Sequence, residues 1–289
     1  MRLSAQDVHY AYVPGRPVLH GASLGIDAGE IVFLLGPNGS GKTTLLECLG
    51  GLRRPHAGRV LLGDADLYAL SPRERARAIG YVPQVHRPVF GYSVLEAVLM
   101  GRTPHLGTFS APGREDRRIA LEALEAVGLS GLADRPYTQL SGGEMRLVLL
   151  ARGLAQGAKF LLLDEPDAHL DPGHRHGILS LVRGFSARGL AALVTSHDPT
   201  NALLYGDRVY LIRGGETLAQ GPPPDVLTPE RLREAYGMEF VLLVGEEGHR
   251  ALVPAQGRIS SSPATESASG EGSRYSRESP ESLPAARKG

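Results

Sequence analysis

The nine residues GPNGSGKTT, Gly36 to Thr44, constrain the fold of this chain more than any other stretch. They match the pattern G-x-x-x-x-G-K-[ST] and follow the apolar run Ile31 to Leu35, which has the length of a buried strand. In such a loop, small residues let successive backbone N–H groups close around a phosphate at the start of a helix. The sequence therefore predicts a strand, a phosphate-binding loop and a helix that begins at Thr43.

Polar side chains in this loop have the chemistry that a nucleoside triphosphate and its metal ion require. Lys42 can reach the β and γ oxygens, and the Thr43 hydroxyl can bind Mg²⁺. An ordinary strand-to-helix turn is the alternative, and the lysine, the threonine and the preceding strand together disfavour it. The residues predicted to contact the nucleotide here are Gly36, Pro37, Asn38, Gly39, Ser40, Gly41, Lys42, Thr43 and Thr44.

A second motif, FLLLDEP from Phe160 to Pro166, places two carboxylates at the end of another apolar run. Asp164 is predicted to hold Mg²⁺, directly or through water, and Glu165 to orient or deprotonate the water that attacks the γ-phosphate. A strand that ends in an acidic turn would look the same in isolation. Together with Lys42 and Thr43, the two carboxylates predict in-line hydrolysis of a nucleotide.

The spacing of apolar runs predicts an α/β fold with a parallel sheet, because helix-length segments separate several of them. The runs are Ile31–Leu35, Val60–Leu62, Phe160–Leu163, Leu190–Thr195 and Val209–Ile212. Residues from about 86 to 157 are mostly helical in pattern and are predicted to form a subdomain inserted into the sheet domain. Residues 1–244 would then be one domain, and residues 245–289, rich in Ser, Pro, Gly and Glu, a disordered tail of open purpose.

Charge and cysteine content disfavour several classes of protein. The chain has 31 basic and 31 acidic residues, so no net charge favours a nucleic-acid partner. Its one cysteine, Cys48, is expected to be a small buried residue without a disulfide partner, and the N-terminus lacks the apolar core of a secretory signal. Both features favour the cytoplasm. Apolar runs such as Leu147–Ala151 are far shorter than the roughly 20 residues that span a bilayer, so another chain would make any membrane crossing.

The stretch LSGGE, residues 140–144, fits a capping box, because Ser141 is followed three residues later by Glu144. By itself a capping box implies no chemistry. The motifs GPNGSGKTT, YVPQ, LSGGE, FLLLDEP, AHLD and TSHD, however, follow one another at suitable intervals. In this order the chain, from about Leu3 to Leu243, resembles the ATP-binding-cassette ATPases, the nucleotide-hydrolysing subunits of ABC transporters. The resemblance implies a P-loop NTPase sheet core, an N-terminal antiparallel β region and an inserted helical subdomain.

The resemblance gives the LSGGE stretch a role in the site of a second subunit. In the family, its serine and glycines face the γ-phosphate of ATP bound to the P-loop of an antiparallel partner, which implies this role for Ser141, Gly142 and Gly143. A helix N-terminus with unfilled N–H groups and a positive dipole end suits an anion, so the capping box is compatible with this role. Two chains related by a two-fold axis would then enclose two ATP molecules.

Four further positions match motifs of the family. Gln84 in YVPQ resembles the glutamine that contacts Mg²⁺ or the water, and Asp171 in AHLD resembles the aspartate at the subunit boundary. His197 in TSHD resembles the histidine that touches the γ-phosphate. Tyr12 stands where the family places an aromatic residue that stacks on adenine, with Tyr10 as an alternative. Without the ordered motifs, these residues would be interpreted as a strand residue, a helix cap or surface side chains.

The sequence departs from the family at two places, neither of which removes a reacting group. Asp167-Ala168-His169 replaces the usual threonine and serine before the AHLD aspartate, and Met145-Arg146 follows the LSGGE stretch in place of a glutamine-rich continuation. The nearby His174 and His176 do not predict a metal site with His169 and Asp171, because no helix or strand register obviously brings them together.

Three local stretches favour import. MGRTPHLG at 100–107, HDPTNAL at 197–203 and LTPERLREAYGMEF at 227–240 resemble the cassettes of iron–siderophore, haem and cobalamin importers, a group that includes molybdate or tungstate systems. The resemblance implies a homodimer on the cytoplasmic face of the cell membrane, bound to an integral membrane permease and serving an extracytoplasmic substrate-binding protein. Residues from about His86 to Phe109 would receive the permease.

Other uses of the same ATPase chemistry are alternatives. A molybdate or tungstate importer would share these motifs. A soluble cassette ATPase outside transport usually has a coiled-coil insertion or a second cassette, and this sequence has neither. Export is disfavoured further, because many exporters fuse the cassette to membrane spans. Which ligand crosses the membrane is not encoded in these motifs.

Overall fold

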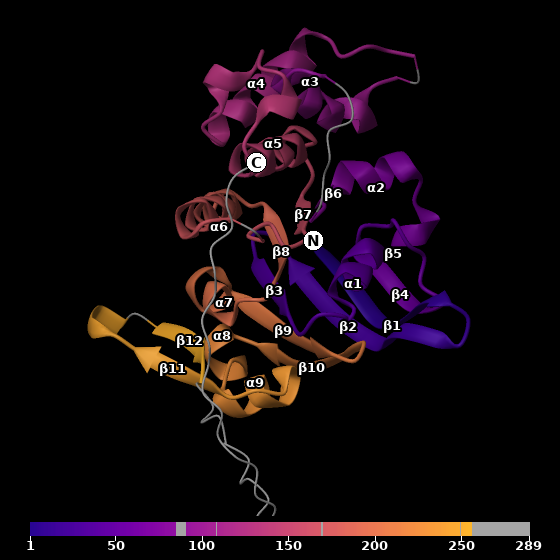
Figure 1. Cartoon of the computed structure of the whole chain (residues 1–289). Coiled ribbons are helices and arrows are strands. Elements are labelled where there is room, and N and C mark those ends of the chain that lie inside the picture. Colours follow the sequence, from indigo (N-terminus) through magenta and orange to yellow (C-terminus); the bar gives the residue numbers. More distant parts are fainter. Residues whose placement is uncertain (85–90, 108, 169, 249, 256–289) are drawn as a thin grey trace, which may run out of the picture. The chain divides into compact units, whose positions relative to one another are not determined.

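A six-stranded sheet with strand order β10-β9-β3-β8-β7-β6 forms the centre of the fold (Figure 1). The computed structural model describes residues 1–84, 91–107, 109–168, 170–248 and 250–255. Strands β3, β6, β7, β8 and β9 pair in parallel, and β10 pairs antiparallel with β9 at one edge. The strands are β3 (Ile31–Leu35), β6 (Ile79–Val82), β7 (Phe160–Leu163), β8 (Ala191–Ser196), β9 (Arg208–Arg213) and β10 (Glu216–Gly221).

Both faces of this sheet are buried, each in its own hydrophobic core. Alternate residues of a strand point to opposite faces, so Phe33 lies in one core and Val32 and Leu34 lie in the other. The Phe33 core contains residues of the helices, and the other core contains residues of the N-terminal strands and of the helix after β3. Burial on both faces explains why these strands are continuous apolar runs in the sequence.

An antiparallel N-terminal sheet with order β2-β1-β4-β5 packs over the second core. Its strands are β1 (Arg2–Val13), β2 (Arg16–Asp27), β4 (Ala57–Leu62) and β5 (Ala65–Asp66). The run at 60–62 was predicted to join the parallel sheet, and this prediction is wrong, because β4 pairs antiparallel with β1. A short apolar run shows that a strand is buried but does not identify its partner.

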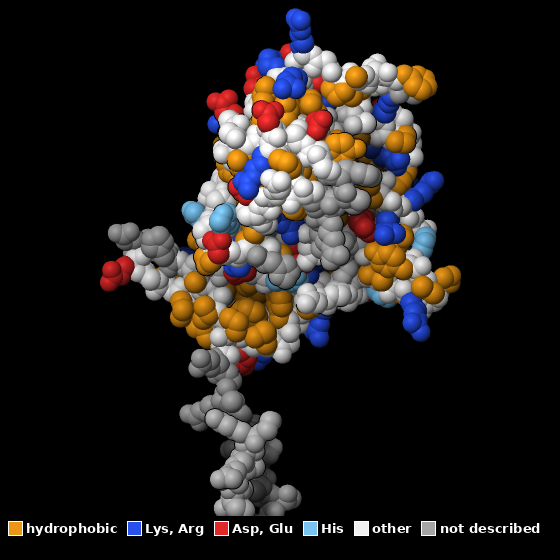
Figure 2. Space-filling view, turned by 45° about the horizontal axis from the view of Figure 1, so that its top comes forward, with side chains coloured by type: hydrophobic (Ala, Val, Ile, Leu, Met, Phe, Trp, Pro, Cys, Tyr) orange, Lys and Arg blue, Asp and Glu red, His pale blue; other side chains and the backbone are white. Residues whose placement is uncertain are grey.

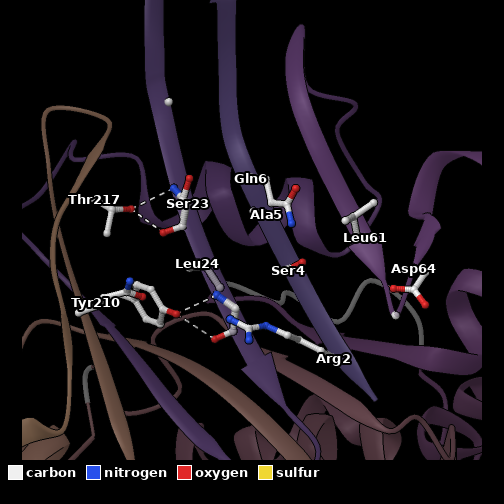
Figure 3. Close-up of a pocket in the computed structure, with 14 residues that line it drawn as sticks. Arg2, Ser4, Ala5, Gln6, Ser23, Leu24, Leu61, Asp64, Tyr210 and Thr217 are labelled. Carbon is white, nitrogen blue, oxygen red and sulfur yellow. Dashed lines mark hydrogen bonds between the residues drawn. The ribbon is translucent and has the colours of Figure 1, made fainter.

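Two side chains join the N-terminal sheet to the central one (Figure 3). The Thr217 hydroxyl accepts a hydrogen bond from the Ser23 N–H at 3.0 Å and donates to the Ser23 carbonyl at 2.7 Å. The Tyr210 hydroxyl makes the same pair of contacts with the backbone of Gly25, at 3.0 and 3.3 Å. These contacts satisfy backbone groups of β2 where it passes β9 and β10.

Between β6 and β7 the described chain is helical, and its helices lie together at one end of the view in Figure 1. Complete capping boxes begin α2 at Ser71, α3 at Ser93 and α5 at Ser141, and the last confirms the box predicted for the LSGGE stretch. The α-helices are α1 (Lys42–Leu49), α2 (Pro72–Ala78), α3 (Val94–Leu99), α4 (Arg114–Ala126), α5 (Gly142–Ala155), α6 (Pro172–Ser186), α7 (Pro199–Tyr205), α8 (Pro223–Val226) and α9 (Pro229–Tyr236). Short 3-10 turns are Leu67–Ala69, Met100–His105, Ser130–Leu132, Tyr137–Gln139 and Glu246–Gly248.

A C-terminal hairpin differs from the predicted start of the tail at residue 245. Strand β11 (Phe240–Val244) pairs antiparallel with β12 (Arg250–Pro254), and the Leu252 side chain is buried in the helix-covered core. The composition of residues 245–289 as a whole concealed the short apolar run in β12. Residues 256–289 lie outside the described residues.

The surface carries charges of both signs. On the face drawn in Figure 2, Lys and Arg side chains are interspersed with Asp and Glu side chains, as the balanced composition leads one to expect. Among the residues that the structure describes, none of the helices has both the length and the apolar composition to cross a bilayer.

Candidate nucleotide site

Four neighbouring parallel strands carry most of the predicted site residues on the loops that follow them. Residues 36–44 follow β3, Gln84 follows β6, Asp164 and Glu165 follow β7, and His197 follows β8. Because β3, β8, β7 and β6 are adjacent and parallel, their carboxyl ends meet at one edge of the sheet. This edge is where open α/β sheets bind ligands.

Glycines allow the loop after β3 to pass very close to its own chain. Gly39 and Gly41 have φ angles of 76° and 100°, in the left-handed region that favours glycine. A Cβ on Gly36 would lie 2.2 Å from the carbonyl oxygen of Ile212, and one on Gly41 would lie 2.7 Å from Leu19 Cδ2. The glycines are therefore required by the chain itself and not only by a ligand.

Lys42 is folded back over the loop and buried. Its Nζ donates hydrogen bonds to the carbonyl oxygens of Gly36 at 2.8 Å and Pro37 at 3.0 Å. Burial lowers the pKa of this ammonium group, and the nearby carboxylates Glu165 and Asp164 partly oppose that shift. The ammonium group is thus held by two neutral carbonyls, beside carboxylates that favour its charged form.

The start of α1 leaves hydrogen-bond donors available. No side chain caps this helix, and the first N–H groups of an α-helix have no partner within the helix. The Ser40 hydroxyl is also buried, and no partner for it is found among the described residues. An uncapped helix start beside an unpaired buried hydroxyl is a suitable environment for a phosphate.

Asp164 accepts three hydrogen bonds from hydroxyl groups. Thr43 Oγ1 donates to Asp164 Oδ1 at 3.2 Å, Thr195 Oγ1 donates to the same oxygen at 2.8 Å, and the Tyr81 hydroxyl donates to Oδ2 at 3.3 Å. Burial and the charge of Asp164 raise the pKa of Tyr81, which keeps its hydroxyl protonated as a donor. The structure therefore brings Thr43 and Asp164 together as predicted, and it adds two donors, Tyr81 of YVPQ and Thr195 of TSHD, to which the sequence assigned no role.

Glu165 is held in an uncommon backbone conformation. Its φ of 45° lies in the left-handed region, and its N–H donates to Thr195 Oγ1 at 2.8 Å. The carboxylate accepts a short hydrogen bond from the Gln84 amide and makes a short ion-pair contact with His197. Strained residues held by several contacts occur frequently at functional sites. Gln84 and His197, predicted from separate motifs, thus both contact the carboxylate of Glu165.

The two candidate aromatic residues on β1 pack edge to face, at 5.2 Å between ring centroids, and both rings lie near Arg53, but their other contacts differ. The Tyr12 hydroxyl lies 3.1 Å from Thr44 Oγ1, and its ring is half exposed beside Arg53, whose Cζ is 4.6 Å from the ring centroid. The Tyr10 ring instead stacks on His56 at 5.0 Å between ring centroids. Of the two, Tyr12 is the residue bonded to the predicted phosphate loop.

The LSGGE residues lie at the start of α5, and their polar contacts in the described part of the chain are made away from the P-loop. Ser141 caps the helix through the predicted box, and in the described part of the chain no hydrogen bond or ion pair joins residues 141–143 to residues 36–44. Asp171 caps the next helix by accepting hydrogen bonds from its first N–H groups. The chain therefore brings the P-loop, Gln84 and the carboxylates together, and among the described residues no hydrogen bond or ion pair links Ser141, Gly142 or Gly143 to them.

Asp167 is a residue whose contacts the motifs did not predict. Its carboxylate is buried and accepts hydrogen bonds from Ser196 Oγ at 2.9 Å and Asn201 Nδ2 at 2.7 Å. Ser196 directly precedes His197, so this carboxylate fixes the loop that carries the histidine. The charged residue directly after DEP was a visible signal, but its partners are 29 and 34 residues away in the chain.

One large cavity lies away from these residues. It has a volume of about 780 Å³, opens on the N-terminal sheet and is lined by residues of β1, β2 and β4 together with Tyr210 and Thr217 (Figure 3). None of the predicted site residues lines it. Its polar groups serve in part to join the two sheets, as described above.

The two remaining expectations concern the burial of Cys48 and a metal site among the histidines near Asp171. Cys48 is buried as expected, and burial raises the pKa of its thiol to about 12. Within the described ranges no group of three His, Cys, Asp or Glu side chains could hold a metal ion. His169 lies outside those ranges, as do residues 85–90 and 108 of the segment predicted to receive the permease.

A family model and individual known sequences indicate the same family for this chain. Residues 19–168 match the family described as ABC transporter. The hemin import ATP-binding protein HmuV of Gloeobacter violaceus is 42% identical over 236 residues, covering 79% of this chain and 85% of that protein. HmuV of Pseudomonas fluorescens is 42% identical over 246 residues, covering 83% of this chain and 94% of that protein.

Solved structures confirm the predicted fold class. A protein described as a metal-chelate type ABC transporter, in an inward-facing conformation, aligns with a TM-score of 0.77 and 31% identity over 88% of this chain and 97% of that chain. A dimeric ATP-binding cassette in a post-hydrolysis state, bound to ADP and Pi, aligns with a TM-score of 0.67 and 29% identity. That alignment covers 76% of this chain and 98% of the cassette.

Proposed function

Because this chain belongs to the ABC transporter family of ATP-binding cassettes, we propose that it is the ATP-hydrolysing subunit of an importer for a metal chelate such as hemin. Membership makes it an ATPase. The observation that carries ATP hydrolysis is the meeting of Gln84, Glu165 and His197 beside Lys42 and Asp164, at the edge where ATP would bind. The similarity to HmuV proteins at 42% identity supports hemin as the ligand.

ATP binds to one chain through the P-loop. The N–H groups at the start of α1 and the Lys42 ammonium group contact the β and γ phosphates, and the unpaired Ser40 hydroxyl offers one more donor. Lys42 exchanges its present carbonyl partners for phosphate oxygens, which restores a full charge partner to a buried cation. The half-exposed Tyr12 ring stacks on adenine.

The oxygen donors around Asp164 fit Mg²⁺, which prefers carboxylate and hydroxyl oxygens over nitrogen. Thr43 and Asp164 would hold the ion, and the Gln84 side chain would reach it or the water beside it. Bound Mg²⁺ neutralises charge on the β and γ phosphates. Tyr81 and Thr195 orient the Asp164 carboxylate from the protein side.

Glu165 acts as the base for the attacking water. The water oxygen bonds to the γ-phosphorus, the bond to the bridging β–γ oxygen breaks, and the water proton passes to the carboxylate. Gln84 and His197 both contact Glu165 and hold it in a fixed direction, while His197 also reaches the γ-phosphate. Hydrolysis yields ADP and phosphate.

A second copy of the chain completes each site. Ser141, Gly142 and Gly143 of one copy approach the γ-phosphate on the P-loop of the other, with Asp171 at the boundary between copies. Two facts support this arrangement: these residues make no polar contact with their own P-loop in the described chain, and a similar cassette of known structure is dimeric. Closure of the dimer on ATP and its opening after hydrolysis supply the movement for transport.

The permease would dock on the helical segment that follows Gln84, at the cytoplasmic face of the membrane. Met100 is partly exposed, and Phe109 is fully exposed at 102% relative accessibility. Because Gln84 bonds to Glu165 and leads into this segment, a change at the γ-phosphate reaches the docking surface through few residues. A substrate-binding protein on the other side of the membrane would deliver the ligand.

Co-purification from native membranes tests this function. The tagged chain, extracted in mild detergent, should carry an integral membrane protein in equal amount, and vesicles containing both should take up hemin when ATP is supplied. Vesicles containing the Glu165→Gln variant are the control for uptake without hydrolysis. Recovery of an active ATPase only from the soluble fraction, with no membrane partner, would contradict the transport function.

A further inference from the structure

His174, in the first turn of α6, bridges two proposed elements of the nucleotide site within one chain. Its Nδ1 makes a short hydrogen bond to the carboxylate of Asp171. The other edge of its ring lies against the LSGGE stretch, because a Cβ on Gly143 would be 2.7 Å from His174 Cδ2 and 3.1 Å from Nε2. One side chain thus contacts the subunit-boundary aspartate and the helix start at the same time.

The two consecutive glycines of the LSGGE stretch have different surroundings. A Cβ on Gly142 would meet nothing within 4 Å, whereas a Cβ on Gly143 would overlap the imidazole ring of His174. Gly142 therefore faces open space, where a ligand of another chain can approach. Gly143 is needed as glycine by its own chain, because the ring occupies the position of a side chain.

The His174 ring connects Asp171 and Gly143 locally and is not part of a continuous hydrophobic core. Behind it lies a hollow of about 350 Å³ between α5 and α6, lined by residues such as Leu147 and Ile178. The His174 side chain itself is 55% exposed, so burial of apolar area explains little of its position. The carboxylate of Asp171 can only accept, so Nδ1 carries the proton of this hydrogen bond and the ring has one orientation.

We propose that His174 is a positioning residue that transmits the position of Asp171 to the start of α5 in the same chain. This inference rests on the proposed function, in which Asp171 lies at the subunit boundary and Ser141–Gly143 contact the nucleotide of the second copy. Movement of Asp171 carries the ring with it, and the ring displaces Gly143. The state of one nucleotide site thereby reaches the half-site that the same chain gives to the other.

Substitution of His174 in the full chain, assembled with its permease, tests the inference. His174→Ala should lower the kcat for ATP hydrolysis by about tenfold and leave the KM for ATP within about twofold of the wild type, because the P-loop is unchanged. His174→Phe keeps a ring without the hydrogen bond, and His174→Asn keeps a donor without the ring. The kcat of each of these two variants should lie between the kcat of the wild type and that of His174→Ala. A kcat of His174→Ala within about twofold of the wild type would overturn the inference.

Two controls separate this result from misfolding and from failure of the proposed function. His176→Ala changes the same helix two residues on, where the side chain contacts Tyr205 instead, and should retain the wild-type kcat. If His174→Ala is unstable, His174→Phe and His174→Asn decide: a kcat below that of the wild type in both supports the contact, and a wild-type kcat in both refutes it. A wild-type complex without ATPase activity would instead refute the proposed function.

Discussion

The two helix starts of the proposed nucleotide site are built in opposite ways. Helix α1 begins after Gly41 and has no side-chain cap. Helix α5 begins after Ser141, whose hydroxyl accepts from the Glu144 N–H while the Glu144 carboxylate accepts from the Ser141 N–H. An uncapped start leaves its N–H groups to a ligand, whereas a capped start is stable before any ligand binds. The P-loop thus gains most from nucleotide, and the LSGGE stretch is a preformed surface.

The glycines of the two regions also differ, although not uniformly. Side chains at Gly36 or Gly41 would collide with their own chain, while one at Gly142 would meet open space. Gly39 and Gly143 are exceptions, because a Cβ on Gly39 would meet nothing within 4 Å and one on Gly143 would overlap His174. The P-loop therefore packs closely against its own chain at two glycines, whereas the LSGGE stretch has one glycine that faces outward. This difference is what a site divided between two copies requires, and it can be tested from either half.

Mixing two inactive variants gives the largest expected effect. Lys42→Ala removes the phosphate contact, and Ser141→Arg places a long cation at the helix start, so each homodimer should lose nearly all ATPase activity. An equal mixture forms heterodimers in half of the pairs, each with one intact site, so about a quarter of the wild-type activity should return. The measurement is ATP hydrolysis after subunit exchange. Absence of recovery, with mixed dimers verified by native mass spectrometry, would contradict the divided site.

Glu165→Gln should lower kcat by about 10²–10⁴-fold, the range for loss of a general base. The amide has the shape of the carboxylate but cannot accept the water proton. Affinity for ATP should be retained, because Lys42 and the start of α1 are unchanged. Single-turnover hydrolysis and equilibrium binding of labelled ATP measure the two quantities separately. A kcat close to that of the wild type would assign the base to another group. The contrast between the P-loop and the LSGGE stretch would not be affected by that result.

Sequence reasoning succeeded where the structure is local. The P-loop turn and the capping box at Ser141 need only residues within a few positions of each other, and the box is confirmed. It failed where a contact joins distant segments. The partners of Asp167 and the antiparallel pairing of β4 depend on which strands become neighbours, and a short apolar run carries no such information.

Tyr12→Ala should raise the KM for ATP by about tenfold, because stacking of a base on an aromatic ring contributes about 1–3 kcal/mol. The kcat should change little, since among the described residues no hydrogen bond joins Tyr12 to Asp164 or Glu165. Tyr10→Ala is the comparison variant, because its ring stacks on His56 and packs edge to face on Tyr12 but makes no hydrogen bond to the P-loop among the described residues. Steady-state kinetics with ATP and GTP would measure both. A larger KM change for Tyr10→Ala would reverse the assignment of the two rings.

The smallest effects come from comparing identical caps in different places. Ser71→Ala and Ser141→Ala each remove the serine of a complete capping box, so each should lower the free energy of unfolding by about 1 kcal/mol. Urea unfolding of the two variants measures this loss. Only Ser141→Ala should also lower kcat, by a few-fold, because its hydroxyl faces the second copy's γ-phosphate in the proposed dimer. Equal kcat values for the two variants would mean that Ser141 serves only as a helix cap, and that Gly142 and Gly143 make the contacts across the interface through their backbone alone.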